Sequence, residues 1–165
     1  MTTAQKNKYM LVDGNALIHR GYHAIPGLTI GKTGEPVGAV YGFTMILLRA
    51  IKDLKPTHIA CSFDLEGPTF RHEEYADYKA TRVKADQELY DQIPRVKEVV
   101  RALNIPIFEK QGFEADDVLG TLAKEICMTN GSECEVMIVT GDMDTLQLVN
   151  SCVKVYTLRK GINDV

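Results

Sequence analysis

The segment YMLVDG (residues 9–14) sets the fold, because four apolar residues end there at an aspartate and a glycine. The pattern returns twice: IACSF (59–63) ends at Asp64, and VMIV (136–139) is followed by Thr140, Gly141 and then Asp142. Near-continuous apolar segments of this length are typical of strands that are buried on both faces, as in parallel sheets. We therefore predict a parallel sheet in which three strands each stop near an aspartate.

Apolar residues at helical spacing fill the intervals between these segments. One stripe runs from residue 40 to 54, a second from 89 to 103 and a third from 118 to 126. Weaker strand patterns at 105–109 and 153–158 complete an alternation of strand and helix. This order predicts a single α/β domain over residues 1–165, with a mostly parallel central sheet and helices on both faces.

Two stretches interrupt the alternation. Residues 25–38 are rich in glycine and proline, so they should form a surface loop. Residues 65–88 form a long polar and charged connection, which inside a compact domain is usually functional or disordered. Residues 1–7 lack the apolar stretch of a signal peptide, and we expect a flexible tail there.

The composition is that of an ordinary soluble globular protein, with 45% apolar and 25% charged residues. No run of about 18 apolar residues is present, so we expect a cytoplasmic protein without a membrane span. The four cysteines form no CxxC pair, which favours free thiols over a zinc site or a disulfide framework.

Acidic residues gather where the predicted strands end. The carboxyl ends of parallel strands share one edge of the sheet, and ligands bind in the crevice there. The group Glu114-Ala115-Asp116-Asp117 opens a predicted helix after the 105–109 strand, and so it should reach the same edge. Seven acids are expected to converge: Asp13, Asp64, Glu114, Asp116, Asp117, Asp142 and Asp144.

Each acid taken alone has an ordinary structural explanation. Asp-Gly after a strand is common turn chemistry, and acids in a first helical turn cap free N–H groups. Seven carboxylates in one cleft, however, would repel one another unless protons or divalent cations neutralise them. Ligands that are oxygen only indicate Mg²⁺ or Mn²⁺ rather than zinc.

The net charge of −3 argues at first against a nucleic-acid partner. The seven acids account for more than this charge, and without them the remainder of the chain carries a net +4. Two hard cations about 4 Å apart can drive hydrolysis of a phosphodiester, so phosphoryl transfer is the expected chemistry.

Together these segments resemble a known family, the N-terminal 5′→3′ exonuclease domain of bacterial DNA polymerase I within the flap-endonuclease superfamily. The resemblance rests on LVDGNALIHRGYHA (11–24), GEPVGAVYGF (34–43), FDLEGPTFRHEEYADYKATR (63–82), GFEADDVLGTLA (112–123) and VTGDMDTLQLV (139–149). Any one motif would be weak evidence, but the joint match is specific. It implies a PIN-like, resolvase-like fold with a helical arch or flexible clamp inserted at 65–88.

The resemblance also implies roles for individual residues. The seven acids would bind two metal ions, Mg²⁺ or Mn²⁺, and Lys79 and Arg82 would take part in catalysis. The DNA-binding residues would be Arg20, Arg71, Tyr75, Tyr78, Lys79 and Arg82, because cations contact phosphates and aromatic rings stack on unpaired bases. His19, His23, His58 and His72 are interpreted as structural or surface residues.

The implied substrate is DNA with a 5′ single-stranded flap or end, including RNA-DNA primer junctions, in replication and repair at the nucleoid. The resemblance also implies a polymerase domain as a partner in the native gene. Family members continue into a helix-hairpin-helix and a further acidic motif, and this sequence ends at Val165 before either.

Three alternatives stay open. The chain could bind metal and single-stranded DNA without turnover, because some ligands of the second metal would lie beyond Val165. It could be a small RNase with a similar acidic core, although such an enzyme would lack the 65–88 insertion. A phosphoacceptor receiver domain also places aspartates at strand ends, but it needs neither the Glu114–Asp117 group nor an arch.

Overall fold

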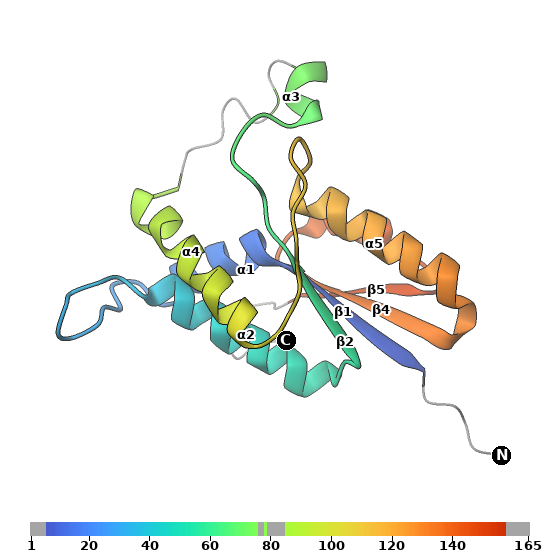
Figure 1. The fold of residues 1–165 in the computed structure, drawn as a ribbon, viewed down its shortest axis with the longest axis horizontal. Helices are drawn as coiled ribbons and strands as arrows, with labels where there is room; N and C mark the ends of the chain where they lie inside the picture. Colours follow the sequence, from blue (N-terminus) through green and yellow to red (C-terminus); the bar gives the residue numbers. More distant parts are fainter. Residues whose placement is uncertain (1–5, 76–77, 79–84, 158–165) are drawn as a thin grey trace.

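A computed structural model describes residues 6–75, 78 and 85–157, with a five-stranded sheet at its centre (Figure 1). All four strand pairs are parallel, and the strand order is β3-β2-β1-β4-β5. The strands are β1 (Asn7–Asp13), β2 (His58–Ser62), β3 (Ile107–Phe108), β4 (Cys134–Val139) and β5 (Val153–Tyr156). The helices are α1 (Gly14–Ala24), α2 (Gly38–Leu54), α3 (Phe70–Glu74), α4 (Gln87–Ala102) and α5 (Ala115–Asn130), with short 3₁₀ helices η1 (Gly131–Glu133) and η2 (Met143–Leu148).

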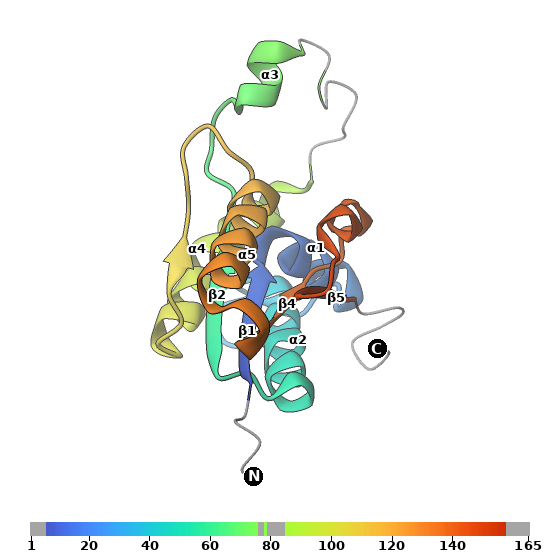
Figure 2. The ribbon, with the colours of Figure 1, turned by 90° about the vertical axis from the view of Figure 1, so that its right-hand side faces the viewer.

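Both faces of the sheet are covered, which explains why its strands are apolar without alternation. Met10 and Val12 pack in the core under α1, α2 and α4, while Leu11, between them, packs in the core under α5. Figure 2 shows the same arrangement from the side, with α3 projecting beyond the carboxyl ends of the strands. The predicted three-layer α/β architecture is confirmed.

Helices α1 and α2 approach each other closely, and this contact fixes the position of α1, the helix that begins directly after Asp13. A Cβ added at Gly42 would lie 2.5 Å from the Cα of Gly21, and one added at Gly21 would lie 2.6 Å from the backbone N of Phe43. Only glycine permits this approach at the two positions. The contact anchors α1 against the core directly below the site described next.

The chain reverses direction in the sheet between β1 and β4. It proceeds from β1 through β2 to β3 on one side and then returns to place β4 and β5 on the other. This is the switch point where ligands bind in open α/β sheets. The order also differs from the 2-1-3-4-5 order of receiver-like flavodoxin folds, so the receiver alternative is wrong.

Several element limits differ from the sequence predictions. The third strand is reduced to Ile107–Phe108, and β1 begins at Asn7, where the sequence suggested a tail. Residues 25–37 form the expected loop, with one isolated bridge between Thr29 and Pro36. Within the 65–88 insertion the structure describes the five-residue α3, but residues 76–77 and 79–84 lie outside it, so the arch stays a prediction.

The expectation that all cysteines are free was wrong for two of them. Cys127, near the end of α5, forms a disulfide with Cys152, just before β5, while Cys61 and Cys134 are free and buried. The pair is 25 residues apart in sequence. Helix α5 packs on the sheet in the same core cluster as β4, and the parallel pairing of β4 with β5 then brings Cys152 beside Cys127. A search for closely spaced CxxC pairs could not detect such a contact.

No helix in the described ranges is both long and apolar enough to span a bilayer.

Candidate active site

Asp13 is the most buried carboxylate of the site, with 6% of its surface exposed. It is the last residue of β1 and the N-cap of α1, and one carboxylate oxygen accepts a hydrogen bond from the backbone N of Ala16 at 3.0 Å. The other oxygen accepts one from the hydroxyl of Thr140 at 2.8 Å. Burial raises the pKa of Asp13 to about 6 against these two hydrogen bonds, and the negative charges of Asp64 and Asp142 raise it further.

Thr140 joins the ends of β1 and β4 across the switch point. Its hydroxyl donates to Asp13 and also accepts from the backbone N of Asp142 at 3.0 Å. Asp142 in turn caps η2, because its carboxylate accepts from the backbone N of Asp144 at 2.9 Å. One buried hydroxyl therefore sets the spacing between Asp13 and the loop that carries Asp142 and Asp144.

Asp64 is held between β2 and the start of α5. Its backbone N donates to the side-chain oxygen of Asn15 at 3.0 Å, and its carboxylate accepts from the backbone N of Ala115 at 2.7 Å. The free N–H groups of a helix N-terminus attract an anion, which explains why a carboxylate of another segment lies there. This contact connects the segment that follows β2 to the acidic group at the start of α5.

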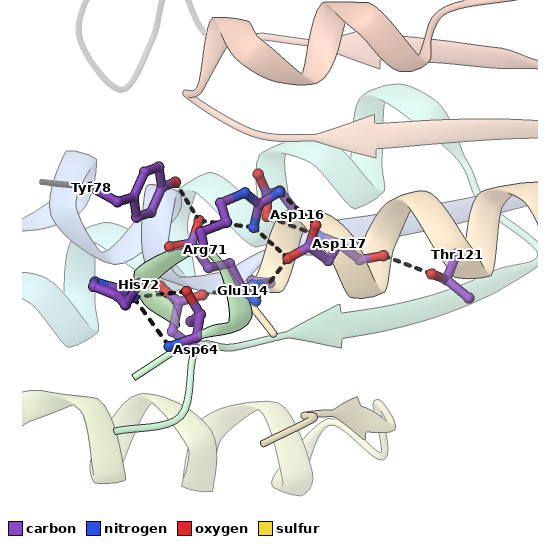
Figure 3. A network of polar contacts seen from close by, with 10 residues as sticks. Asp64, Arg71, His72, Tyr78, Glu114, Asp116, Asp117 and Thr121 are labelled. Atoms are coloured by element: carbon purple, nitrogen blue, oxygen red, sulfur yellow. Dashed lines mark hydrogen bonds and ion pairs between the residues drawn. The ribbon is translucent and has the colours of Figure 1, made fainter. Parts of the chain in front are cut away.

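The N-cap and the first turn of α5 carry three acids that point in different directions (Figure 3). Glu114 is nearly buried, and its carboxylate accepts from the hydroxyl of Tyr78 at 3.1 Å. The pKa of Asp116 is raised by partial burial and by the charge of Asp117. Asp117 instead accepts two hydrogen bonds from Arg71, at 2.6 and 2.7 Å, and a third from the backbone N of Glu114 at 3.0 Å.

The structure therefore separates Asp117 from the other predicted ligands. Six of the seven acids line one pocket at the carboxyl edge of the sheet, and Asp117 lies outside its lining. Arg71 forms a bidentate ion pair with Asp117 and lies 3.5 Å from Glu114, and this partnership holds the pKa of Arg71 above its usual range. The six acids are Asp13, Asp64, Glu114, Asp116, Asp142 and Asp144.

The remaining predicted residues are distributed unevenly around this pocket. Arg20 and Tyr78 line it, whereas Tyr75 is 66% exposed and does not. Lys79 and Arg82 lie outside the described residues.

Sequence reasoning missed four polar residues of the site. His19 and His23 were interpreted as structural or surface residues, yet both line the pocket beside Arg20. Asn15 and Thr140 were not singled out, although they hold Asp64 and Asp13. The available signal was position, because Asn15 directly follows an Asp-Gly strand end and Thr140 directly follows β4. His58 and His72 do have structural contacts, on the ring of Tyr9 and the hydroxyl of Thr69 respectively.

The pocket fits a hard divalent cation by its donor set. Its acidic lining is made of carboxylates from four separate segments, and oxygen ligands of this kind suit Mg²⁺ or Mn²⁺. Among the described residues, no three of these carboxylates bring one oxygen each within 4.8 Å of one another. That spacing is consistent with like charges that repel one another without a cation.

The family is shown by comparison with known proteins. The family described as "5'-3' exonuclease, N-terminal resolvase-like domain" matches residues 8–164, and the chain belongs to it. DNA polymerase I of Chloroflexus aurantiacus is 47% identical over 148 residues, which cover 88% of this chain and 15% of that protein. DNA polymerase I of Bacillus subtilis is 42% identical over 161 residues, or 98% of this chain and 18% of the polymerase. The chain thus spans less than a fifth of these relatives, and its family places it in a nuclease class of enzymes.

Solved structures show the same fold at low sequence identity. The bacteriophage T5 D15 protein, co-crystallised with metal ions, superposes with a TM-score of 0.70 at 19% identity, covering 92% of this chain and 54% of D15. The catalytic core of Rad2 in complex with a DNA substrate gives a TM-score of 0.52 at 18% identity, covering 93% of this chain and 42% of Rad2. The five-stranded parallel sheet is therefore the PIN-like sheet of this class, as predicted.

Asp13→Asn should stabilise the metal-free protein at neutral pH by up to about 3 kcal/mol. Folding raises the pKa of Asp13 from its ordinary value of 3.8 to about 6, so the stability that protonated Asp13 contributes is complete below pH 3.8. It is lost as the pH rises through about 6. In urea unfolding with a chelator present, the free energy of unfolding of the variant should rise relative to that of the wild type as the pH increases from 3.8 through about 6. A stability difference that is constant across this range would contradict the assignment.

The Arg71–Asp117 pair should behave as a coupled unit in solution. Because both side chains are mostly buried, at 25% and 20% exposure, a double-mutant cycle with Arg71→Met and Asp117→Asn should give a coupling free energy of about 1–2 kcal/mol in urea unfolding. The more exposed pair Arg95–Glu35 is the control and should couple by less than about 0.5 kcal/mol. Additive effects at Arg71 and Asp117 would mean that the pair is absent in solution.

Proposed function

We propose that this chain is the metal-dependent core of a 5′→3′ exonuclease or flap endonuclease that hydrolyses DNA phosphodiester bonds. The single observation that carries the proposal is the pocket at the switch point, where six carboxylates from four segments converge. Family membership supports the nuclease class, and the pocket supplies the acidic chemistry that such a reaction needs.

The carboxylates would hold one or two Mg²⁺ or Mn²⁺ ions. Asp13, Asp64, Asp116 and Asp142 come from four different segments around the pocket, so they are the first candidates for shared ligands. Two such ions would supply an activated water and would stabilise the leaving oxygen of a phosphodiester. Asp117 we now assign to positioning, because its contacts with Arg71 and Glu114 orient the first turn of α5.

The DNA side of the site is proposed to involve α1 and the segment after α3. Arg20 lines the pocket with the acids, where a guanidinium suits a phosphate oxygen. Tyr78 lines the same pocket and presents a ring for base stacking, while its hydroxyl holds Glu114. Lys79 and Arg82, which lie in sequence between Tyr78 and α4, would be catalytic cations. Tyr75, directly after α3, would offer an exposed ring to the DNA.

The substrate would be DNA with a 5′ flap or end, including RNA-DNA primer junctions. Rad2 was solved with a DNA substrate, and the relatives with matching sequence are DNA polymerase I proteins. We therefore propose a role in replication and repair at the nucleoid, with a polymerase domain as partner in the native protein.

Asp142→Ala should reduce cleavage of a 5′-flapped duplex in Mn²⁺ by at least about a hundredfold, because the variant removes a carboxylate from the lining of the pocket. Product release on a denaturing gel measures the rate. Asp53→Ala is the matched control, since Asp53 is next to the last residue of α2, pairs with Arg49 and Tyr156, and does not line the acidic pocket. Its cleavage rate should equal that of the wild type.

Metal-dependent cleavage that survives Asp142→Ala would contradict the assignment of the carboxylate pocket as the active site. Salt-dependent DNA binding with no cleavage at any Mn²⁺ concentration would instead support the alternative of a binding module without turnover. Parallel flaps of RNA and DNA separate the nuclease proposed here from an RNase.

A further inference from the structure

A second group of potential metal ligands lies away from the acidic pocket and consists of three cysteines. Cys127 comes from the last turns of α5, Cys134 begins β4 and Cys152 precedes β5. Their sulfur atoms all lie within 4.8 Å of one another, and the sulfurs of Cys134 and Cys152 are 3.6 Å apart. Residues separated by up to 25 positions in sequence therefore meet at one point of the fold.

The surroundings suit an ion rather than a simple apolar core. The three cysteines line a surface pocket with Lys124, Ser132 and Asn150, and Cys127 and Cys152 are only partly buried. The thiol of Cys134 is within reach of the carbonyl oxygens of Ile126 and Gly131, at 3.8 and 3.6 Å. Lys124, on the lining of the same surface pocket, carries a positive charge that would favour thiolates over thiols there.

The distances agree with a shared soft cation. Zn–S bonds of about 2.3 Å in a tetrahedral site place two thiolate sulfurs about 3.8 Å apart. The sulfurs of Cys134 and Cys152, 3.6 Å apart, are close to this separation, and all three sulfurs lie within 4.8 Å of one another, so small rotations about side-chain bonds would bring them to one ion. We propose that the reduced chain binds one Zn²⁺, or a similarly soft divalent cation, through Cys127, Cys134 and Cys152.

The disulfide makes this site conditional on reduction. A dithiol reductant transfers two electrons and two protons to the Cys127–Cys152 disulfide, which yields two thiols and leaves the reductant as its own disulfide. The three thiols then lose their protons to solvent as their sulfurs coordinate the cation. In reducing compartments, clustered cysteines of this kind are more often metal sites than lasting disulfides.

The bound ion would clamp the end of α5 to the β4–β5 edge of the sheet. A Cβ added at Gly120 of α5 would lie 3.3 Å from the side chain of Leu148 in η2, so the two segments pack closely between the cysteines and the acidic pocket. Asp116 opens the same helix, and Asp142 precedes the same 3₁₀ helix. The site is thus a structural clamp on two elements that carry acids of the pocket.

The test uses Co²⁺ as a spectroscopic probe on the full chain. After reduction with a dithiol and anaerobic desalting, Co²⁺ should produce a thiolate-to-metal charge-transfer band that saturates at one ion per chain, and Zn²⁺ should abolish it by displacement. Carboxylate ligands give no such band, so Asp142→Ala should leave it unchanged. That variant separates this site from the proposed nuclease site, since either can fail without the other.

Cys127→Ser and Cys152→Ser should each weaken Co²⁺ binding by at least about tenfold. Both side chains are partly exposed, so these variants should fold, which circular dichroism verifies. Cys61→Ala, a buried free thiol in the opposite core, is the control and should keep the band. Absence of a charge-transfer band in the reduced wild type, or full retention of it in both serine variants, would overturn the proposal.

Discussion

Asp13 is a carboxylate placed where water is largely excluded, and the hydrogen bonds and charges of the site depend on this burial. Its two hydrogen bonds, from Ala16 and Thr140, lower its pKa, yet burial and the neighbouring charges of Asp64 and Asp142 win and raise it to about 6. Carboxylates whose pKa is raised by burial in this way cluster at functional sites of proteins. A divalent cation would reverse the sign of the local field and turn the same repulsion into attraction.

The topology explains why the acids arrive from so many segments. Because all strands are parallel, every strand end and the start of α5 reach the same edge, and the reversal of strand order between β1 and β4 opens the crevice there. Helix N-termini then organise the acids: Asp13 caps α1, Asp64 contacts the first amide of α5 and Asp142 caps η2. The capping explanation and the metal explanation are therefore not alternatives. Asp64 and Asp142 each accept the capping hydrogen bond with one oxygen, and each oxygen of Asp13, which accepts one hydrogen bond, keeps a second lone pair for a cation.

Much of this arrangement was predictable from sequence, for reasons that are visible in the structure. Apolar runs that end at Asp13, Asp64 and Asp142 identify buried parallel strands and their common edge, and six acids do line one pocket. The partnership of Arg71 with Asp117 was not predictable, because it joins residues 46 positions apart through side-chain geometry alone. The cysteine cluster could not be predicted for the same reason, since no local spacing in the sequence identifies Cys127, Cys134 and Cys152 as neighbours.

The central claim is that the carboxylate pocket at the switch point binds the divalent cations of a nuclease. A crystal grown with Mn²⁺ and measured at the manganese absorption edge tests it most directly. We expect an anomalous difference peak within about 2.2 Å of carboxylate oxygens from at least two of Asp13, Asp64, Asp116 and Asp142. A well-ordered pocket without such a peak, at Mn²⁺ concentrations that support cleavage, would contradict the account.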